Sequence, residues 1–105
     1  MKVGVFGGTF DPIHTGHLTL AEDARTLLKL DRILFVPTGR PWLKAGQPIS
    51  DARHRVAMLK EAVKSAPHFQ ISELEIRRPG PTYTVDTLEE LRRNLGPTAT
   101  IYLLL

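Results

Sequence analysis

The chain has 105 residues, no cysteine, only 7% aromatic residues and no long apolar run. The absence of cysteine excludes a disulfide framework and a thiolate metal site. No apolar run approaches the roughly 18 residues that a membrane-spanning helix needs, and the first residues do not form a secretory leader. We therefore expect a cytoplasmic protein that does not insert into a membrane.

The excess of one sign of charge over the other is also small. Fourteen Lys and Arg residues against eleven Asp and Glu residues give a formal net charge of +3. A small positive excess suits an anionic partner, but the basic residues are scattered, whereas a nucleic-acid-binding surface gathers them into a patch or stripe. The composition therefore favours a free nucleotide over a nucleic acid as the ligand.

What the chain does contain is a regular alternation of two apolar patterns. Short apolar runs predict strands, and apolar stripes at helical spacing predict helices. The strands are expected at residues 2–6, 32–36, 68–72 and 100–105, and the helices at residues 17–29, 51–65 and 84–95. Such alternation is typical of parallel strands joined by right-handed crossovers. We expect a single α/β domain, residues 1–105, built as a doubly wound open parallel sheet with ligands at the carboxyl ends of its strands.

The end of the chain departs from an ordinary terminus. Residues 101–105 read Ile-Tyr-Leu-Leu-Leu, which is typical of a central, buried strand. As a last strand it would expose an unpaired apolar edge, and such edges promote aggregation. We therefore expect the sheet to be truncated after this fourth strand, with the C-terminal part of the domain missing, and we expect the isolated chain to self-associate.

A glycine-rich turn between the first strand and the first helix holds two histidines, His14 and His17. The glycine spacing matches neither the dinucleotide fingerprint G-x-G-x-x-G nor the Walker loop. At the first turn of a helix, backbone N–H groups and the positive end of the helix dipole favour an anion, and imidazoles can donate hydrogen bonds to its oxygens. We predict a nucleotide phosphate site here. The alternative is that the two rings only cap the helix or lie exposed.

The turn resembles the T/H-x-G-H signature of a nucleotidyltransferase superfamily, here at residues 14–17. Within it, residues 7–14, 34–37 and 77–88 make the chain similar to bacterial nicotinate mononucleotide adenylyltransferases. The resemblance implies a Rossmann-like nucleotidyltransferase fold and adenylyl transfer from ATP to nicotinate mononucleotide, giving deamido-NAD and pyrophosphate in NAD biosynthesis. It also implies Mg²⁺ as a cofactor, bound through the substrate phosphates. The sequence shows no cage of metal-ligating residues, so no protein ligand is assigned.

The resemblance also suggests roles for single residues. His14 and His17 would be the catalytic residues and would bond oxygens of the ATP phosphates. Lys44 would be either a phosphate contact on the long loop at residues 37–48 or a solvated side chain. Thr84 would lie beside the nicotinate carboxylate, or would serve only as the N-cap of its helix. The other residues expected to bind ATP and its phosphates are Gly7, Gly8, Thr9, Phe10, Asp11 and Gly16.

Two other functions stay open. Phosphopantetheine adenylyltransferases, a rival among small-metabolite adenylyltransferases, share the first block but usually carry Thr in place of His14. They also lack the Arg-Arg-Pro-Gly-Pro block at residues 77–81. A noncatalytic nucleotide-binding fragment is the second alternative, because the family's Ile-Ser-Ser-Thr-x-Ile-Arg block, which helps to bind ATP, is absent from these residues. Adenylyl transfer is therefore predicted for a full-length parent, whereas the 105 residues alone lack part of the ATP site.

Overall fold

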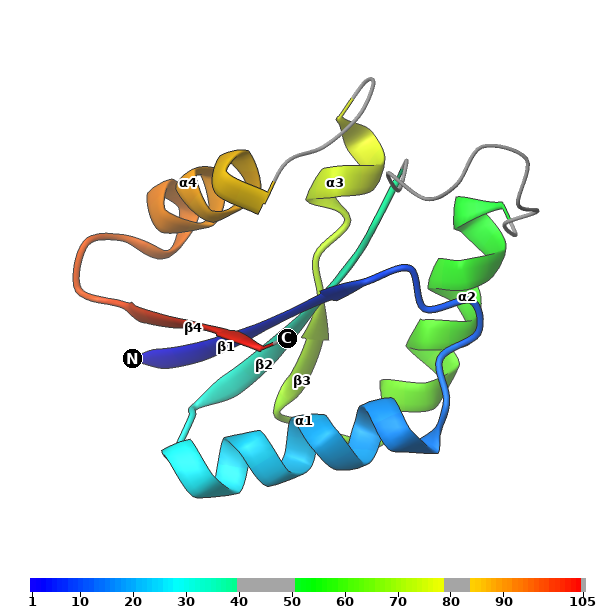
Figure 1. Ribbon diagram of the computed structural model, residues 1–105, viewed down its shortest axis with the longest axis horizontal. Coiled ribbons are helices and arrows are strands. Elements are labelled where there is room, and N and C mark those ends of the chain that lie inside the picture. Colours follow the sequence, from blue (N-terminus) through cyan, green and yellow to red (C-terminus); the bar gives the residue numbers. More distant parts are fainter. Residues whose placement is uncertain (40–50, 79–83, 105) are drawn as a thin grey trace.

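The computed structural model describes residues 1–39, 51–78 and 84–104. Within them, four parallel strands form one sheet in the order β3-β2-β1-β4 (Figure 1). The elements are β1 (Lys2–Gly8), α1 (Thr15–Leu28), β2 (Arg32–Pro37), α2 (Ala52–Val63), β3 (Phe69–Ile71), α3 (Leu74–Arg77), α4 (Thr84–Leu95) and β4 (Thr100–Leu104). The predicted parallel, doubly wound sheet is confirmed, and the short helix α3 is an addition to it.

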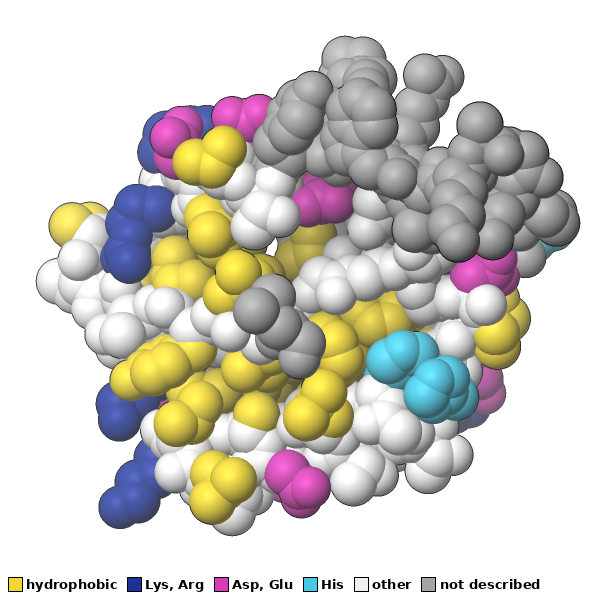
Figure 2. Space-filling view, in the orientation of Figure 1, with side chains coloured by type: hydrophobic (Ala, Val, Ile, Leu, Met, Phe, Trp, Pro, Cys, Tyr) yellow, Lys and Arg dark blue, Asp and Glu magenta, His cyan; other side chains and the backbone are white. Residues whose placement is uncertain are grey.

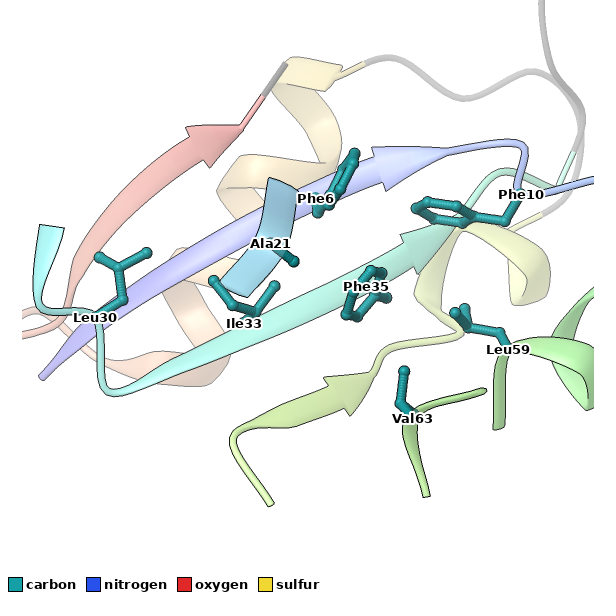
Figure 3. Close-up of a cluster of buried hydrophobic side chains, with 8 residues drawn as sticks. All are labelled: Phe6, Phe10, Ala21, Leu30, Ile33, Phe35, Leu59 and Val63. Atoms are coloured by element: carbon teal, nitrogen blue, oxygen red, sulfur yellow. The ribbon is translucent and has the colours of Figure 1, made fainter. Parts of the chain in front are cut away.

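Alternating side chains give the sheet two apolar faces. The first core cluster lies between the sheet and helices α1 and α2 (Figure 3), and consists of Phe6, Phe10, Ala21, Leu30, Ile33, Phe35, Leu59 and Val63. The second core cluster lies between the sheet and helices α3 and α4, and consists of Val3, Val5, Leu34, Val36, Leu74 and Leu91. Because β1 and β2 are covered on both faces, their sequences are continuous apolar runs. Within the described ranges, no helix is both long enough and apolar enough to cross a membrane.

The strand order creates a place for a ligand. Helix α1 leads from β1 to β2, whereas the chain returns from β3 through α3 and α4 to β4 on the other side of β1. The direction of winding therefore changes next to β1. In open α/β sheets ligands bind outside the carboxyl ends of the strands at such a point. The turn that joins β1 to α1 lies at this edge of the sheet (Figure 1).

The fourth strand is an edge strand. In the described part of the chain β4 pairs only with β1, and Leu103 is 41% exposed. The strand predicted at residues 100–105 is present at Thr100–Leu104, and the expected unpaired edge is confirmed for the described residues. Its described side chains are partly buried or exposed, because no strand within the described residues pairs with its second edge.

Candidate active site

The turn after β1 is anchored in the core by Phe10. This residue has a φ of 50°, a left-handed conformation that non-glycine residues adopt only at a cost. Phe10 is 3% exposed and lies in the cluster of Figure 3, where its ring centroid is 5.5 Å from that of Phe6 and 5.7 Å from that of Phe35. Its ring centroid is also 5.2 Å from that of His17. The side chain of Phe10 is therefore part of the first core cluster, and it supports the His17 ring at the edge of the sheet.

The two histidines close the first turn of α1 with reciprocal hydrogen bonds. The Nδ1 atom of His14, the N-cap residue, accepts a hydrogen bond from the backbone N–H of Gly16 at 3.1 Å. The Nδ1 atom of His17 accepts one from the backbone N–H of His14 at 3.0 Å. The arrangement is a capping box, in which a Ser or Thr and a Glu or Gln usually act. The ring centroids are 3.8 Å apart, so the two imidazoles lie against each other.

Gly16 makes this arrangement possible. A Cβ atom at position 16 would lie 3.0 Å from Cε1 of His14 and 3.1 Å from its Nδ1. Both distances are shorter than ordinary van der Waals contact, so a larger residue would push the His14 ring away from the N–H that it accepts from. The glycine between the two histidines therefore lets the His14 ring lie against the first turn of the helix without a shift.

The hydrogen bonds determine where the protons of the two rings lie. A backbone N–H can only donate, so each Nδ1 is unprotonated and the proton of each neutral ring is on Nε2. Burial, and then the neighbouring His14, lower the pKa of His17 from its ordinary value of 6.5. The first turn of α1 has no acidic residue to oppose an anion. At neutral pH the pair therefore provides two Nε2–H donors at the positive end of a helix. Figure 2 shows histidine side chains gathered on the surface in view.

The remaining residues predicted for the phosphate site lie just before and just after Phe10 in the chain. Gly7 and Gly8 are the last residues of β1, and a Cβ on Gly8 would touch the Phe10 ring at 3.4 Å. Thr9 is partly buried, and Asp11 is exposed. Residues 9–17, which we call the histidine turn, thus present exposed groups on one side and pack against the core on the other.

Two predicted site residues do not join the histidine turn. Lys44 lies outside the described residues. Thr84 is exposed and is the first residue of α4. Because α4 packs on the second core cluster and α1 on the first, Thr84 lies across the sheet from the histidine pair (Figure 1). A ligand that contacts both places would have to extend along the carboxyl edge of the sheet.

A buried arginine at the same edge was not predicted from the sequence. Arg55, on α2, is 2% exposed, and its Nη1 donates hydrogen bonds to the carbonyl oxygens of Thr9 at 3.0 Å and Thr38 at 2.6 Å. The signal that could have revealed it is its position on the apolar side of the helix, next to Val56 and one turn before Leu59. A cation in such a stripe needs buried acceptors.

A polar network on the other face was also missed. The buried hydroxyl of Thr87 donates to Oε2 of Glu75 at 2.6 Å and accepts from Nη1 of Arg78 at 3.2 Å. Nη2 of Arg78 also donates to Oε1 of Glu90 at 2.7 Å. We call these four residues the α3–α4 network. It ties the residue before segment 79–83 to α4, the helix that follows this segment and begins at Thr84.

The described residues contain no preformed metal cage. In residues 1–39, 51–78 and 84–104, no three His, Asp or Glu side chains are grouped closely enough to hold a metal ion. The histidine turn instead places imidazole N–H groups beside a helix N-terminus, an arrangement that is able to bind an anion.

Comparison with known proteins agrees with this geometry. The model of the family described as cytidylyltransferase-like matches residues 5–104, nearly the whole chain. The chain belongs to the cytidylyltransferase-like family. Among curated members, a probable nicotinate-nucleotide adenylyltransferase of Dehalococcoides mccartyi is 50% identical over 105 residues, which are 100% of this chain and 52% of that protein. A protein of the same name from Thermomicrobium roseum is 50% identical over 98% of this chain and 48% of its own length.

Solved structures show the same fold. The nicotinic acid mononucleotide adenylyltransferase of Plasmodium falciparum, in complex with NaAD, superposes with a TM-score of 0.79 at 21% identity, covering 97% of this chain and 50% of that one. The same enzyme in complex with APC gives a TM-score of 0.77. The Rossmann-like nucleotidyltransferase fold predicted for this family member is therefore confirmed. The chain spans about half the length of the curated relatives that it matches.

Proposed function

We propose that the protein carrying this chain transfers an adenylyl group from ATP to nicotinate mononucleotide, forming deamido-NAD and pyrophosphate. The observation that carries the proposal is the capping box of His14 and His17, which leaves an Nε2–H donor on each ring at the carboxyl edge of the sheet. The names of the half-identical relatives support the choice of substrates.

The histidine turn suits a reaction that asks for positioning and charge neutralisation. A phosphate oxygen of the mononucleotide attacks the α-phosphorus of ATP in line, and the bond from this phosphorus to the oxygen bridging to the β-phosphate breaks. The bonding electrons leave with pyrophosphate, so no nucleophilic side chain is required. In this proposal the Nε2–H groups of His14 and His17 donate to ATP phosphate oxygens, and His17 lies nearest the charge that develops between the α- and β-phosphates.

Other residues take supporting roles in the proposal. Gly7, Gly8 and Thr9 bring backbone and hydroxyl donors to the phosphates, and Asp11 orders the turn. Thr84, at the N-terminus of α4, lies beside the nicotinate carboxylate at the far end of the ligand. Lys44, outside the described residues, is a further phosphate contact.

Magnesium fits the proposal without a protein cage. The described residues hold no group of three possible metal ligands, and Mg²⁺ prefers oxygen and keeps several of its waters. The ion is therefore assigned to the substrate phosphates, where it supplies charge neutralisation. With ATP and nicotinate mononucleotide as substrates, we assign the protein to the cytoplasm.

A coupled pyrophosphate assay tests the function. Because the chain spans half of its relatives, we would compare the 105-residue chain with a chimera in which the uncovered part of the D. mccartyi relative is joined to it. We expect pyrophosphate release from the chimera with ATP and nicotinate mononucleotide. Release only with phosphopantetheine would favour the rival adenylyltransferase. A folded chimera that binds ATP without turnover, beside an active relative, would favour a noncatalytic nucleotide-binding role.

We also propose that the 105-residue chain self-associates through β4. In the described residues the second edge of β4 has no partner strand, and Leu103 is exposed beside a groove lined by Leu88, Arg92 and Ile101. Light scattering at high concentration should show oligomers, and Leu103→Lys should shift them towards monomer by placing a charge on the edge. A monodisperse wild-type monomer would contradict this proposal.

A further inference from the structure

Arg55 is the largest side chain that is almost completely buried in the described part of the protein. Burying a guanidinium group removes its hydration, which is costly unless hydrogen-bond acceptors replace the water. The acceptors here include two backbone carbonyls from different segments, those of Thr9 and Thr38. The Arg55 side chain of α2 therefore reaches, within the protein interior, the point where β1 and β2 end.

The contact continues the pairing of the two strands beyond their last rung. The ladder between β1 and β2 ends with Gly8 opposite Pro37, and the N–H of Thr38 then donates to the carbonyl oxygen of Gly8 at 2.9 Å. After this bond the strands separate, because Thr9 leads into the histidine turn. Nη1 of Arg55 lies between the separated segments and donates to both, so it takes the place of the next ladder hydrogen bonds.

This bridge is linked to the histidine pair through Phe10. Thr9 directly precedes Phe10, whose left-handed backbone and buried ring support His17 at a centroid distance of 5.2 Å. A shift of the Thr9 carbonyl would move the Phe10 backbone, and the His17 ring would lose its packing surface. The guanidinium also places a positive charge on the protein side of a turn that offers N–H donors to an anion.

We infer that Arg55 is a positioning residue for the phosphate site. It holds the ends of β1 and β2 at a fixed separation, so that the histidine turn keeps the geometry in which both Nε2–H groups face the ligand. The inference rests on the proposed function for the nature of the ligand, a polyphosphate. Lysine cannot replace arginine fully, because an ammonium group on a flexible stem lacks the planar donor geometry that bridges two fixed carbonyls.

The test compares Arg55→Met and Arg55→Lys with the wild-type 105-residue chain. The matched control is Arg53→Met, which removes the same charge from the same helix at a side chain that is 89% exposed. The probe is inorganic tripolyphosphate. Its dissociation constant is measured by calorimetry at a temperature well below the midpoint of thermal unfolding of each variant. Amide hydrogen exchange is followed at residues 9–17. We expect Arg55→Met to weaken tripolyphosphate binding about 10- to 100-fold, the usual effect of losing one hydrogen bond to a charged group.

The two readouts separate positioning from simple loss of stability. Arg55→Met should also speed exchange in the histidine turn, Arg55→Lys should recover part of the affinity, and Arg53→Met should match the wild type within about twofold. A folded Arg55→Met chain with wild-type affinity and exchange would overturn the inference. If that variant does not fold, a folded Arg55→Lys chain with wild-type affinity and exchange would overturn it equally.

Failure of the proposed function has a different signature. If the chimera shows no adenylyl transfer but tripolyphosphate binding and turn exchange still depend on Arg55, the positioning role stands and the reaction is wrong. If the wild-type chain does not bind tripolyphosphate, the assignment of a polyphosphate to this site is overturned.

Discussion

The structures on the two faces of the sheet, near the carboxyl ends of its strands, are stabilised by different interactions. On the α1 face, the histidine turn uses a capping box of two imidazoles only three residues apart, supported by the Phe10 ring. On the α4 face, the α3–α4 network uses charged side chains from α3, from the residue that follows it and from α4, with one buried hydroxyl among them. The first arrangement depends on ring protonation and close packing, and the second on a buried hydroxyl between charges. The two regions should therefore respond to different perturbations.

The largest expected difference concerns catalysis. His17→Ala in the chimera should lower kcat about 10²- to 10³-fold, the usual loss when one donor to a developing negative charge is removed. The KM for nicotinate mononucleotide should change little, because the ring is assigned to ATP phosphates. Steady-state kinetics measures both constants, and His54→Ala, at an exposed position of α2, is the control. Equal losses in kcat and mononucleotide binding would count against the role of His17.

The α3–α4 network should matter more for stability than for phosphate binding. Thr87→Val keeps the shape of the side chain but removes the hydroxyl that donates to Glu75 and accepts from Arg78, which should lower the free energy of unfolding by about 1–3 kcal/mol. Urea unfolding measures the change, and the exposed Thr26→Val on α1 is the matched control. Tripolyphosphate affinity should stay unchanged. A Thr87→Val chain as stable as the wild type would show that the network is incidental.

A smaller steric change should act only on the histidine turn. Gly16→Ala brings a methyl group to 3.0 Å from the His14 ring, so the ring has to shift and the cap hydrogen bond should weaken, at a cost of up to about 1 kcal/mol that offsets the better helix propensity of alanine. Gly7→Ala is the control for stability, because a Cβ there would meet only the Val36 carbonyl oxygen at 3.9 Å. Urea midpoints of the two variants should differ accordingly. If Gly16→Ala is the more stable of the two, the close packing of His14 is not needed.

The smallest expected effect is the pH dependence of stability. Because burial lowers the pKa of His17 in the folded chain, the unfolded chain binds a proton more readily than the folded one. The stabilisation is fully present above the ordinary value of 6.5 and is lost as the pH falls through the lowered pKa. Urea midpoints should therefore decline below about pH 6.5, and less so in His17→Gln. If the urea midpoints of the wild type and of His17→Gln depend on pH in the same way, the decline is not caused by His17.

The sequence was informative where periodicity carries the structure. The apolar patterns placed four strands and the long helices within a few residues of their observed bounds, because each burial face repeats along the chain. Helix α3, with four residues, is too short to show a period. Capping by the two histidines was one of the interpretations that the sequence allowed, but propensity rules, which favour Ser, Thr, Asp and Asn, did not select it. The partners of Arg55 and Thr87 depend on tertiary contacts between segments distant in sequence, which one sequence does not specify.

The commitment of both Nδ1 atoms to backbone donors makes the histidine turn its own spectroscopic reporter. In ¹⁵N-labelled protein, His14 and His17 should each show a protonated Nε2 resonance and an unprotonated Nδ1 resonance. An arriving anion would move the first and leave the second in place. Anion binding at the histidine turn can thus be followed through the Nε2 resonances of the protein, with no label on the ligand.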